Sequence, residues 1–74
     1  MDMRRQHISS SSIRSAGYDK ETKTLEVEFV SGGVYQYKGV PEYVYTEFLA
    51  SPSRGVYFST EIRDHYPTTK VSEA

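Results

Sequence analysis

LEVEFVSGGVYQY, residues 25–37, is the stretch of sequence from which the fold of this chain can be argued. Leu25, Val27 and Phe29 alternate with glutamates, which is the period of a strand with one buried and one solvated face. The tyrosines after the glycine pair alternate in the same way. Because glycine takes positive φ angles at little steric cost, the pair predicts a turn, and the whole stretch predicts a β-hairpin.

The length of the loop determines how the two strands pair. A two-residue loop at the glycines would place apolar residues of one strand opposite polar residues of the other. A three-residue loop at 31–33 places Phe29 opposite Tyr35 and Val27 opposite Tyr37, which keeps one face aromatic and the other charged. We therefore predict the three-residue loop.

A further strand is predicted before the hairpin. Residues 13–19 can pair antiparallel with the first hairpin strand across a short polar loop at 20–22. The expected register faces Ile13 toward Phe29. It leaves three residues on the opposite face of the sheet: Arg14, Ala16 and Tyr18.

Two helices are predicted after the hairpin. Pro41 followed by Glu42 is a typical helix start, because proline has a fixed φ and a carboxylate is favoured at the positive end of the helix dipole. The apolar residues that follow recur at helical spacing. They are Val44, Tyr45, Phe48 and Leu49 in the first helix and Phe58, Ile62 and Tyr66 in the second. The second helix is expected to run to about residue 65, before Pro67.

These elements predict an α+β fold, a small three-stranded antiparallel β-meander packed against two C-terminal helices in the order β-β-β-α-α. The single domain is expected to span residues 12–67. Residues 1–11 are predicted to be a flexible N-terminal arm and residues 68–74 a polar C-terminal tail, because neither segment has a periodicity that can be placed.

The composition excludes several classes of protein. The chain has 74 residues, no cysteine and nearly balanced charges, with 9 Lys+Arg against 10 Asp+Glu. The lack of cysteine excludes disulfides and cysteine-based metal sites, and a cytoplasmic location is expected. No apolar run is long enough to span a membrane, so no membrane association is expected. No metal or cofactor site is predicted, because Glu61 and His65 have the spacing of an ordinary helix-surface pair.

No set of catalytic residues can be recognised. A serine or threonine nucleophile needs a neighbouring base, and the two histidines lie in the N-terminal arm and near a helix end. We therefore expect a protein that is not an enzyme.

One group of candidate binding residues consists of Arg54, Gly55 and Arg63. Free amides at the start of the second helix, together with the Arg54 guanidinium, could hold a phosphate or a carboxylate. The alternative is a turn capped by Ser53 with a solvated arginine. Arg63 could belong to the same site or pair with neighbouring carboxylates.

A second group consists of Tyr35, Tyr37 and Lys38. Two exposed aromatic residues on one sheet face can stack unpaired RNA bases. The hairpin register favours the alternative, in which the rings belong to the core and the hydroxyls reach its edge. On the face that the helices leave open, Val30 and Val34 predict a small apolar patch for a dimer or protein contact.

The order of motifs along the chain resembles the KTSC domain family. The resemblance rests on Ser12-Ile13, Gly17-Tyr18-Asp19, Leu25-x-Val27-x-Phe29, Gly33-x-Tyr35-x-Tyr37, Val40-Pro41, Tyr45, Ser53-x-Gly55-x-Tyr57-Phe58 and Ile62-Arg63-x-x-Tyr66. It covers roughly residues 8–66. The family takes its name from the C-terminus of some lysyl-tRNA synthetases and includes small stand-alone bacterial and phage proteins. Its function is unassigned, so the resemblance implies a folding unit and an RNA partner but no activity.

We therefore expect a small non-catalytic binding module, with RNA, in particular a tRNA-related molecule, as its partner. The binding candidates are Tyr35, Tyr37, Lys38, Arg54, Gly55 and Arg63. The alternative is a protein-interaction or homodimerising module that uses the Val30/Val34 face. A small-ligand or anion binder is the third and least favoured function.

Overall fold

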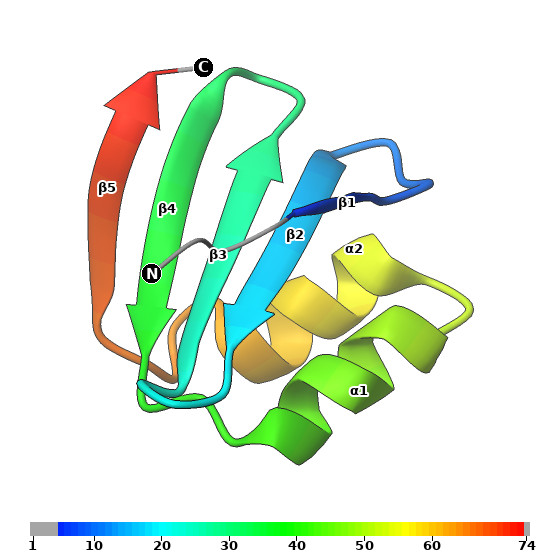
Figure 1. The fold of residues 1–74 in the computed structure, drawn as a ribbon. Helices are drawn as coiled ribbons and strands as arrows, with labels where there is room; N and C mark the ends of the chain where they lie inside the picture. The colour runs from blue at the N-terminus through cyan, green and yellow to red at the C-terminus, as the bar shows by residue number, and fades with distance from the viewer. Residues whose placement is uncertain (1–4, 74) are drawn as a thin grey trace.

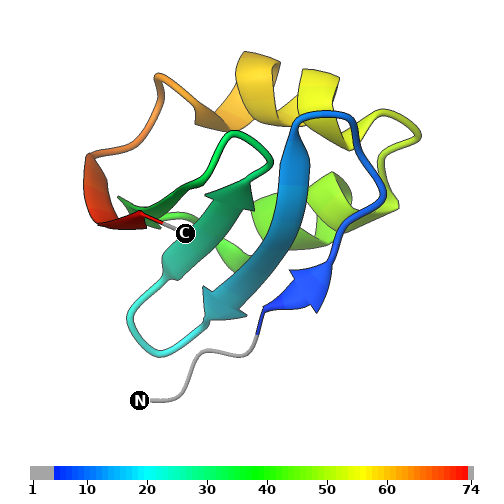
Figure 2. The same cartoon turned by 90° about the horizontal axis from the view of Figure 1, so that it is seen from above.

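The chain forms a five-stranded antiparallel sheet with its helices inserted before the last strand in the computed structural model, which describes residues 5–73 (Figure 1). The strands are β1 (Gln6–His7), β2 (Ile13–Asp19), β3 (Thr24–Phe29), β4 (Gly33–Lys38) and β5 (Thr68–Glu73), and they are ordered in the sheet as in the chain. Between β4 and β5 come α1 (Glu42–Ala50), α2 (Arg54–Tyr57) and the π-helical segment η1 (Phe58–Ile62). The helices cover one face of the sheet (Figures 1 and 2).

The fold class is confirmed as α+β, and the three predicted strands form an antiparallel meander, but the sheet has five strands and the helices are followed by β5 instead of ending the chain. Residues 6–7, predicted to be part of the arm, pair with β2, and residues 68–73, predicted to be a tail, pair with β4. Both segments are polar, so their side chains carry no strand signal. Their backbone groups instead pair with edges of β2 and β4 that would otherwise lack partners. Ile8 follows β1 and is 3% exposed, which ties this end to the core.

The central hairpin forms with a register two residues away from the predicted one. The Gly32 N–H donates a hydrogen bond to the Phe29 carbonyl at 2.9 Å, so the loop ends at Gly32, whose φ of 119° suits glycine. Val27 pairs with Tyr35 instead of Tyr37. Because the shift is even, the side chains keep their predicted faces.

Strand β2 contains a bulge that overturns part of the prediction. Ile13 pairs with Phe29 as expected, but the register changes between Ile13 and Ser15. A shift of one residue moves the following side chains to the other face. Ser15 therefore points to the open face, and the prediction that Ala16 and Tyr18 lie there is wrong. Ala16 is fully buried, and the Tyr18 ring packs against the core.

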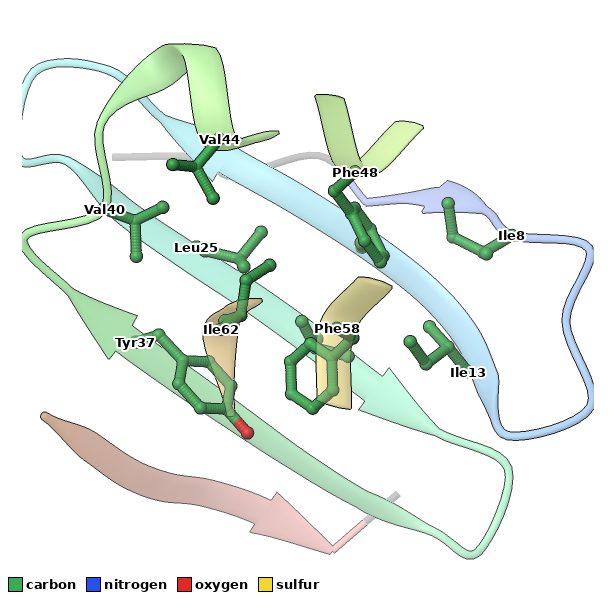
Figure 3. Packing of buried hydrophobic residues seen from close by; sticks show 11 residues of the cluster. Ile8, Ile13, Leu25, Tyr37, Val40, Val44, Phe48, Phe58 and Ile62 are labelled. Carbon is green, nitrogen blue, oxygen red and sulfur yellow. The ribbon is translucent and has the colours of Figure 1, made fainter. Parts of the chain in front are cut away.

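The core lies between the sheet and the helices (Figure 3). Helix α1 contributes the predicted stripe, with Val44 and Phe48 buried and Tyr45 and Leu49 half-buried against the cluster. The second helix does contribute Phe58 and Ile62, but it is not the continuous α-helix that the spacing predicts. After one turn of α2 the backbone changes to π-helical hydrogen bonding, in which Arg63 N–H donates to the Phe58 carbonyl at 2.9 Å.

Candidate functional site

A pocket of about 530 Å³ lies between strands β3 and β4 and segment η1. Its floor is aromatic, and is formed by Phe29, Tyr35, Tyr37 and Phe58, of which Tyr37 and Phe58 are buried and the other two half-buried. Its rim is polar and exposed, and is formed by Arg63, Asp64 and the hydroxyl residues Ser12, Ser31, Ser59 and Thr68. An apolar floor with a polar rim is the usual composition of a ligand pocket. We call it the aromatic pocket.

The rings of the floor hold one another in place. Tyr35 meets Phe29 edge-to-face at a centroid distance of 5.5 Å, and Phe29 meets Phe58 in the same way at 5.3 Å. Phe58 then meets Tyr37 at 5.3 Å with an interplanar angle of 82°. Such pairs contribute about 0.5–1.5 kcal/mol each beyond their buried area. The floor is therefore a preformed apolar surface.

Tyr37 gives the floor a polar group. The residue is only 4% exposed, and its hydroxyl oxygen points away from Leu25 and Val40 (Figure 3). Within residues 5–73 the hydroxyl has no hydrogen-bond partner. Burial, with a smaller contribution from Tyr35, raises its pKa to about 12, so the group stays neutral and able to donate at physiological pH.

The π-helical segment determines where Arg63 and Asp64 lie. In an α-helix, residues three and four apart share a face, which would separate Arg63 from Phe58. The hydrogen bond from Arg63 to Phe58 spans five residues, so the two residues lie closer together around the helix than an α-helix would place them. Both Arg63 and Asp64 act electrostatically on the Tyr37 hydroxyl, Arg63 lowering and Asp64 raising its pKa. A charge of each sign therefore lies near this hydroxyl.

A second, more polar groove of about 440 Å³ adjoins the aromatic pocket and shares Ser12 and Ser59 with it. The four serines at 9–12 form one side and residues 52–56 the other. Gly55 permits this close approach, because a Cβ atom there would lie 3.0 Å from the Ser12 Oγ. We call this the serine groove. It offers hydroxyl groups beside the aromatic pocket.

The structure brings together only some of the predicted binding residues. Tyr35, Tyr37 and Arg63 line the aromatic pocket, which confirms that both tyrosines lie on the covered face of the sheet. Arg54 and Gly55 line the serine groove instead. Lys38 lines neither surface, and its Nζ donates to the Gln36 Oε1 at 3.2 Å.

The predicted anion site at Arg54 takes a different form. Ser53 occupies the N-cap position of α2 but its side chain forms no capping hydrogen bond. The Arg54 Nε donates to the Leu49 carbonyl at 3.1 Å, so part of this guanidinium is used within the fold. The short helix α2 then continues into η1 without presenting a separate arginine site.

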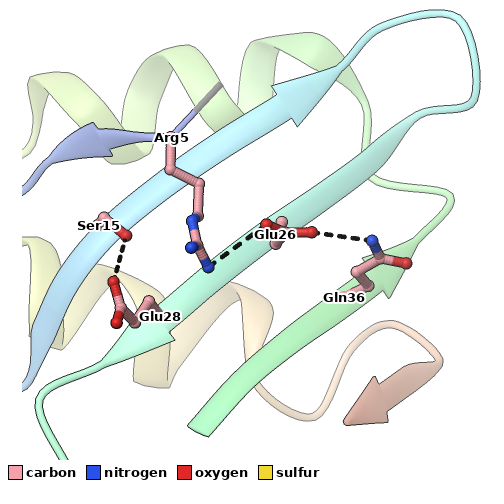
Figure 4. A network of polar contacts seen from close by, with 5 residues as sticks. All are labelled: Arg5, Ser15, Glu26, Glu28 and Gln36. Carbon is pink, nitrogen blue, oxygen red and sulfur yellow. Dashed lines mark hydrogen bonds and ion pairs between the residues drawn. The ribbon is translucent and has the colours of Figure 1, made fainter. Parts of the chain in front are cut away.

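The open sheet face is polar where an apolar patch was predicted. The prediction at Val34 is wrong, because this residue is only 4% exposed, while Val30 is 46% exposed. Three polar contacts cross the face instead (Figure 4). Ser15 donates to Glu28, Gln36 donates to Glu26, and Arg5 forms an ion pair with Glu26 at 3.4 Å. Strand β5 extends the sheet beside Val34, which pairs with Ser72.

Sequence reasoning missed Asp64 and the hydroxyl residues of the pocket rim. Arg63 and Asp64 are adjacent in sequence, and that adjacency was the available signal, but α-helical spacing gave no reason to place them above an aromatic floor. Within the described part of the chain, no group of His, Asp and Glu side chains is arranged to hold a metal ion. No helix among residues 5–73 has the length and apolar character needed to cross a membrane.

Comparisons with known proteins agree on one family. A family model described as the KTSC domain matches residues 9–66. An uncharacterised protein of Stutzerimonas stutzeri is 45% identical over 65 residues, which cover 86% of this chain and 92% of that protein. A lysine–tRNA ligase of Nostoc punctiforme is 36% identical over 60 residues, which cover 81% of this chain but only 11% of the ligase. The crystal structure of a KTSC domain protein from Yersinia pestis has a TM-score of 0.93 and 39% identity, covering 96% of this chain and 100% of that one.

Proposed function

This chain belongs to the KTSC domain family, and we propose that it is a non-catalytic module that binds RNA. A segment similar to it also occurs within lysine–tRNA ligases. The observation that carries the proposal is the aromatic pocket, in which Tyr35 and Phe29 are half-buried beneath an exposed rim that contains Arg63. Single-stranded RNA is commonly held by aromatic rings that contact its bases and by cations that contact its phosphates.

The charge distribution favours RNA contacts through individual side chains over a general electrostatic attraction of the whole protein to RNA. The chain as a whole has a formal net charge of −1, so it has no broad attraction to a phosphate backbone. Positive groups are nevertheless present beside the aromatic floor. Arg63 is on the rim, and the Lys70 Nζ lies 5.9 Å from the centre of the Tyr35 ring. A base contacting the floor would place its phosphates near these cations.

The serine groove provides neutral polar contacts for the same strand. Because it shares Ser12 and Ser59 with the aromatic pocket, a chain of nucleotides leaving the pocket can enter it directly. Serine hydroxyls both donate and accept hydrogen bonds, so they suit ribose hydroxyls and phosphate oxygens. Binding through a few bases and about two phosphates predicts a modest salt slope, with log K falling by about 1.4 per tenfold rise in salt.

The test is an NMR titration of the ¹⁵N-labelled protein with tRNA and with a short single-stranded RNA, at low and moderate salt. We expect amide shifts at Tyr35, Tyr37, Arg63 and the serine groove, and we expect them to diminish as salt is added. If neither RNA produces shifts at high concentration, the proposal is wrong.

Two matched variants test whether Arg63 contacts the RNA. Arg63→Gln removes the rim cation and is expected to weaken RNA binding about three- to tenfold, since exposed phosphate contacts are individually modest. Arg14→Gln removes an exposed arginine of β2 that lines neither the pocket nor the groove, and it is expected to bind RNA like the unchanged protein. Equal losses in both variants would show that only net charge matters.

A further inference from the structure

We infer that the aromatic pocket holds one unpaired guanine base of the bound RNA, with the Asp64 carboxylate accepting hydrogen bonds from the base. The inference rests on the proposed RNA-binding function and adds a base preference to it. Three features of the pocket carry it, namely the aromatic floor, the carboxylate and guanidinium of adjacent residues on the rim, and the Tyr37 hydroxyl without a partner.

The floor and the size of the pocket suit a planar base. A volume of about 530 Å³ lies within the range of small-ligand pockets. Phe29 and Tyr35 are only half-buried, so part of their ring surface is available for contact with a base. Phe58 and Tyr37 close the deeper side of the pocket. An unpaired RNA base that is no longer stacked on its neighbours would regain apolar contact with these rings.

The Tyr37 hydroxyl is a polar group that a ligand in the pocket can reach. Within residues 5–73 it has no hydrogen-bond partner. Its oxygen is accessible although the residue as a whole is buried, since no side-chain oxygen or nitrogen of the described residues is both buried and unpaired. A ligand with a hydrogen-bonding edge can therefore bond to this hydroxyl.

The charged rim distinguishes guanine from the other bases. A carboxylate accepts two parallel hydrogen bonds through its two oxygens. Guanine alone among the RNA bases presents two adjacent donors, N1–H and the N2 amino group, on its Watson–Crick edge. Its O6 lies beside them as an acceptor, and arginine is the usual donor to this atom. Asp64 and Arg63 therefore match the donor and acceptor order of guanine.

Both charged side chains are available for such contacts. Asp64 and Arg63 are exposed, and among residues 5–73 neither side chain forms a hydrogen bond or an ion pair. They lie near enough to the Tyr37 hydroxyl to act on it electrostatically. A base on the floor would therefore have the carboxylate, the guanidinium and the hydroxyl around its edge.

The test measures fluorescence anisotropy with four labelled heptaribonucleotides. Each has three uridines on either side of a central guanosine, inosine, adenosine or uridine. Inosine lacks only the N2 amino group, so it removes one of the two predicted hydrogen bonds to Asp64. We expect the guanosine RNA to bind about tenfold more tightly than the inosine RNA, as one specific charged contact provides, and more tightly still than the adenosine and uridine RNAs.

Two variants locate the preference. Asp64→Asn is expected to bind the guanosine and inosine RNAs equally, because asparagine has one acceptor oxygen and its NH2 group would face the second donor of guanine. Glu61→Gln removes an exposed carboxylate of η1 that does not line the pocket, and it is expected to keep the tenfold preference. Retention of the preference in Asp64→Asn would overturn the assignment to this residue.

The outcomes separate this inference from the proposed function. Equal, salt-sensitive binding of all four RNAs would overturn the guanine preference and leave the RNA-binding function intact. No binding of any of them would overturn both.

Discussion

The Nε atom of Arg54 donates a hydrogen bond to the carbonyl oxygen of Leu49 at 3.1 Å, which links the start of α2 to the end of α1. The last carbonyls of a helix have no partner within the helix, and α1 has no basic residue in its own last turn. Arg54 supplies that missing positive group from the next helix. Its guanidinium therefore serves the fold, although the sequence marked it as a ligand contact.

Arg54→Ala is therefore expected to lower the free energy of unfolding by about 1–2 kcal/mol, because it removes a partly buried hydrogen bond from a charged donor. Arg63→Ala is the control, since Arg63 is exposed, and a change within about 0.5 kcal/mol is expected there. Urea unfolding of both variants measures the difference. A larger loss in Arg63→Ala than in Arg54→Ala would contradict this assignment.

Gly33→Ala is expected to destabilise the protein by about 1–2 kcal/mol through overpacking. A Cβ atom at Gly33 would lie 2.7 Å from the Tyr35 Cε1, so the tyrosine ring would have to move within the aromatic floor. The backbone of Gly33 is not left-handed, so steric contact is the sole expected cause.

A double-mutant cycle tests that cause. Leucine at position 35 lacks the ring edge that meets the new Cβ, so the penalty of Gly33→Ala should fall by more than 0.5 kcal/mol in a Tyr35→Leu background. Unfolding free energies of the two single variants and the double variant give this coupling. Strict additivity would show that the cost of the alanine comes from the backbone instead.

Tyr18→Phe is expected to cost about 1 kcal/mol of stability, because it removes the hydrogen bond that the Tyr18 hydroxyl donates to the Val40 carbonyl. The ring itself, stacked on Tyr45 at 5.2 Å, would remain. Tyr43→Phe is the matched control, since Tyr43 is 65% exposed, and almost no change is expected. Thermal unfolding of the two variants measures the difference, and equal stability would show that the Tyr18 hydrogen bond does not contribute to stability.

The stability of the protein is expected to fall as the pH rises from about 10 to about 12. The Tyr37 pKa is raised from 10.0 in the unfolded chain to about 12 in the fold, so the folded state holds this proton more tightly. The resulting stabilisation is fully present below pH 10 and is lost as the pH rises through 12. Tyr57, whose pKa is also about 12, contributes in the same direction, and its hydroxyl donates to Glu47.

Two measurements test this dependence. The ¹³Cζ resonance of labelled Tyr37 should titrate near pH 12 in the folded protein and near pH 10 in concentrated urea. Urea unfolding of Tyr37→Phe should show a shallower decline between pH 10 and 12 than the unchanged chain. A Tyr37 resonance that titrates near pH 10 in the folded protein would show that its hydroxyl is well solvated.

Much of the fold could be predicted from strong local patterns in the sequence. The alternation of Leu25, Val27 and Phe29 predicted the buried face of the hairpin, and the even register shift left that face unchanged. Pro41 and the apolar spacing after it predicted α1 correctly. These features depend on apolar side chains whose burial stabilises the element that carries them, so their pattern can be recognised in the sequence.

Strands β1 and β5 could not be predicted in this way. The side chains of residues 6–7 and 68–71 are exposed and mostly polar, and both strands are placed by backbone pairing with the edges of β2 and β4. Edge pairing depends on where the chain returns in space, because any backbone can form it. The bulge near Ser15 could not be predicted from local sequence either, because the packing of the whole sheet determines which register forms.

By itself the sequence determined the α+β class, the covered hairpin face and the presence of tyrosines and arginines that it marked as candidate binding residues. Only the tertiary structure decided which of them meet. The π-helical segment places Arg63 and Asp64 by the aromatic floor, while the Arg54 guanidinium bonds to the end of α1. The reason is physical: periodicity reports the burial of side chains along one element, whereas a binding site depends on distances between elements that no local pattern encodes.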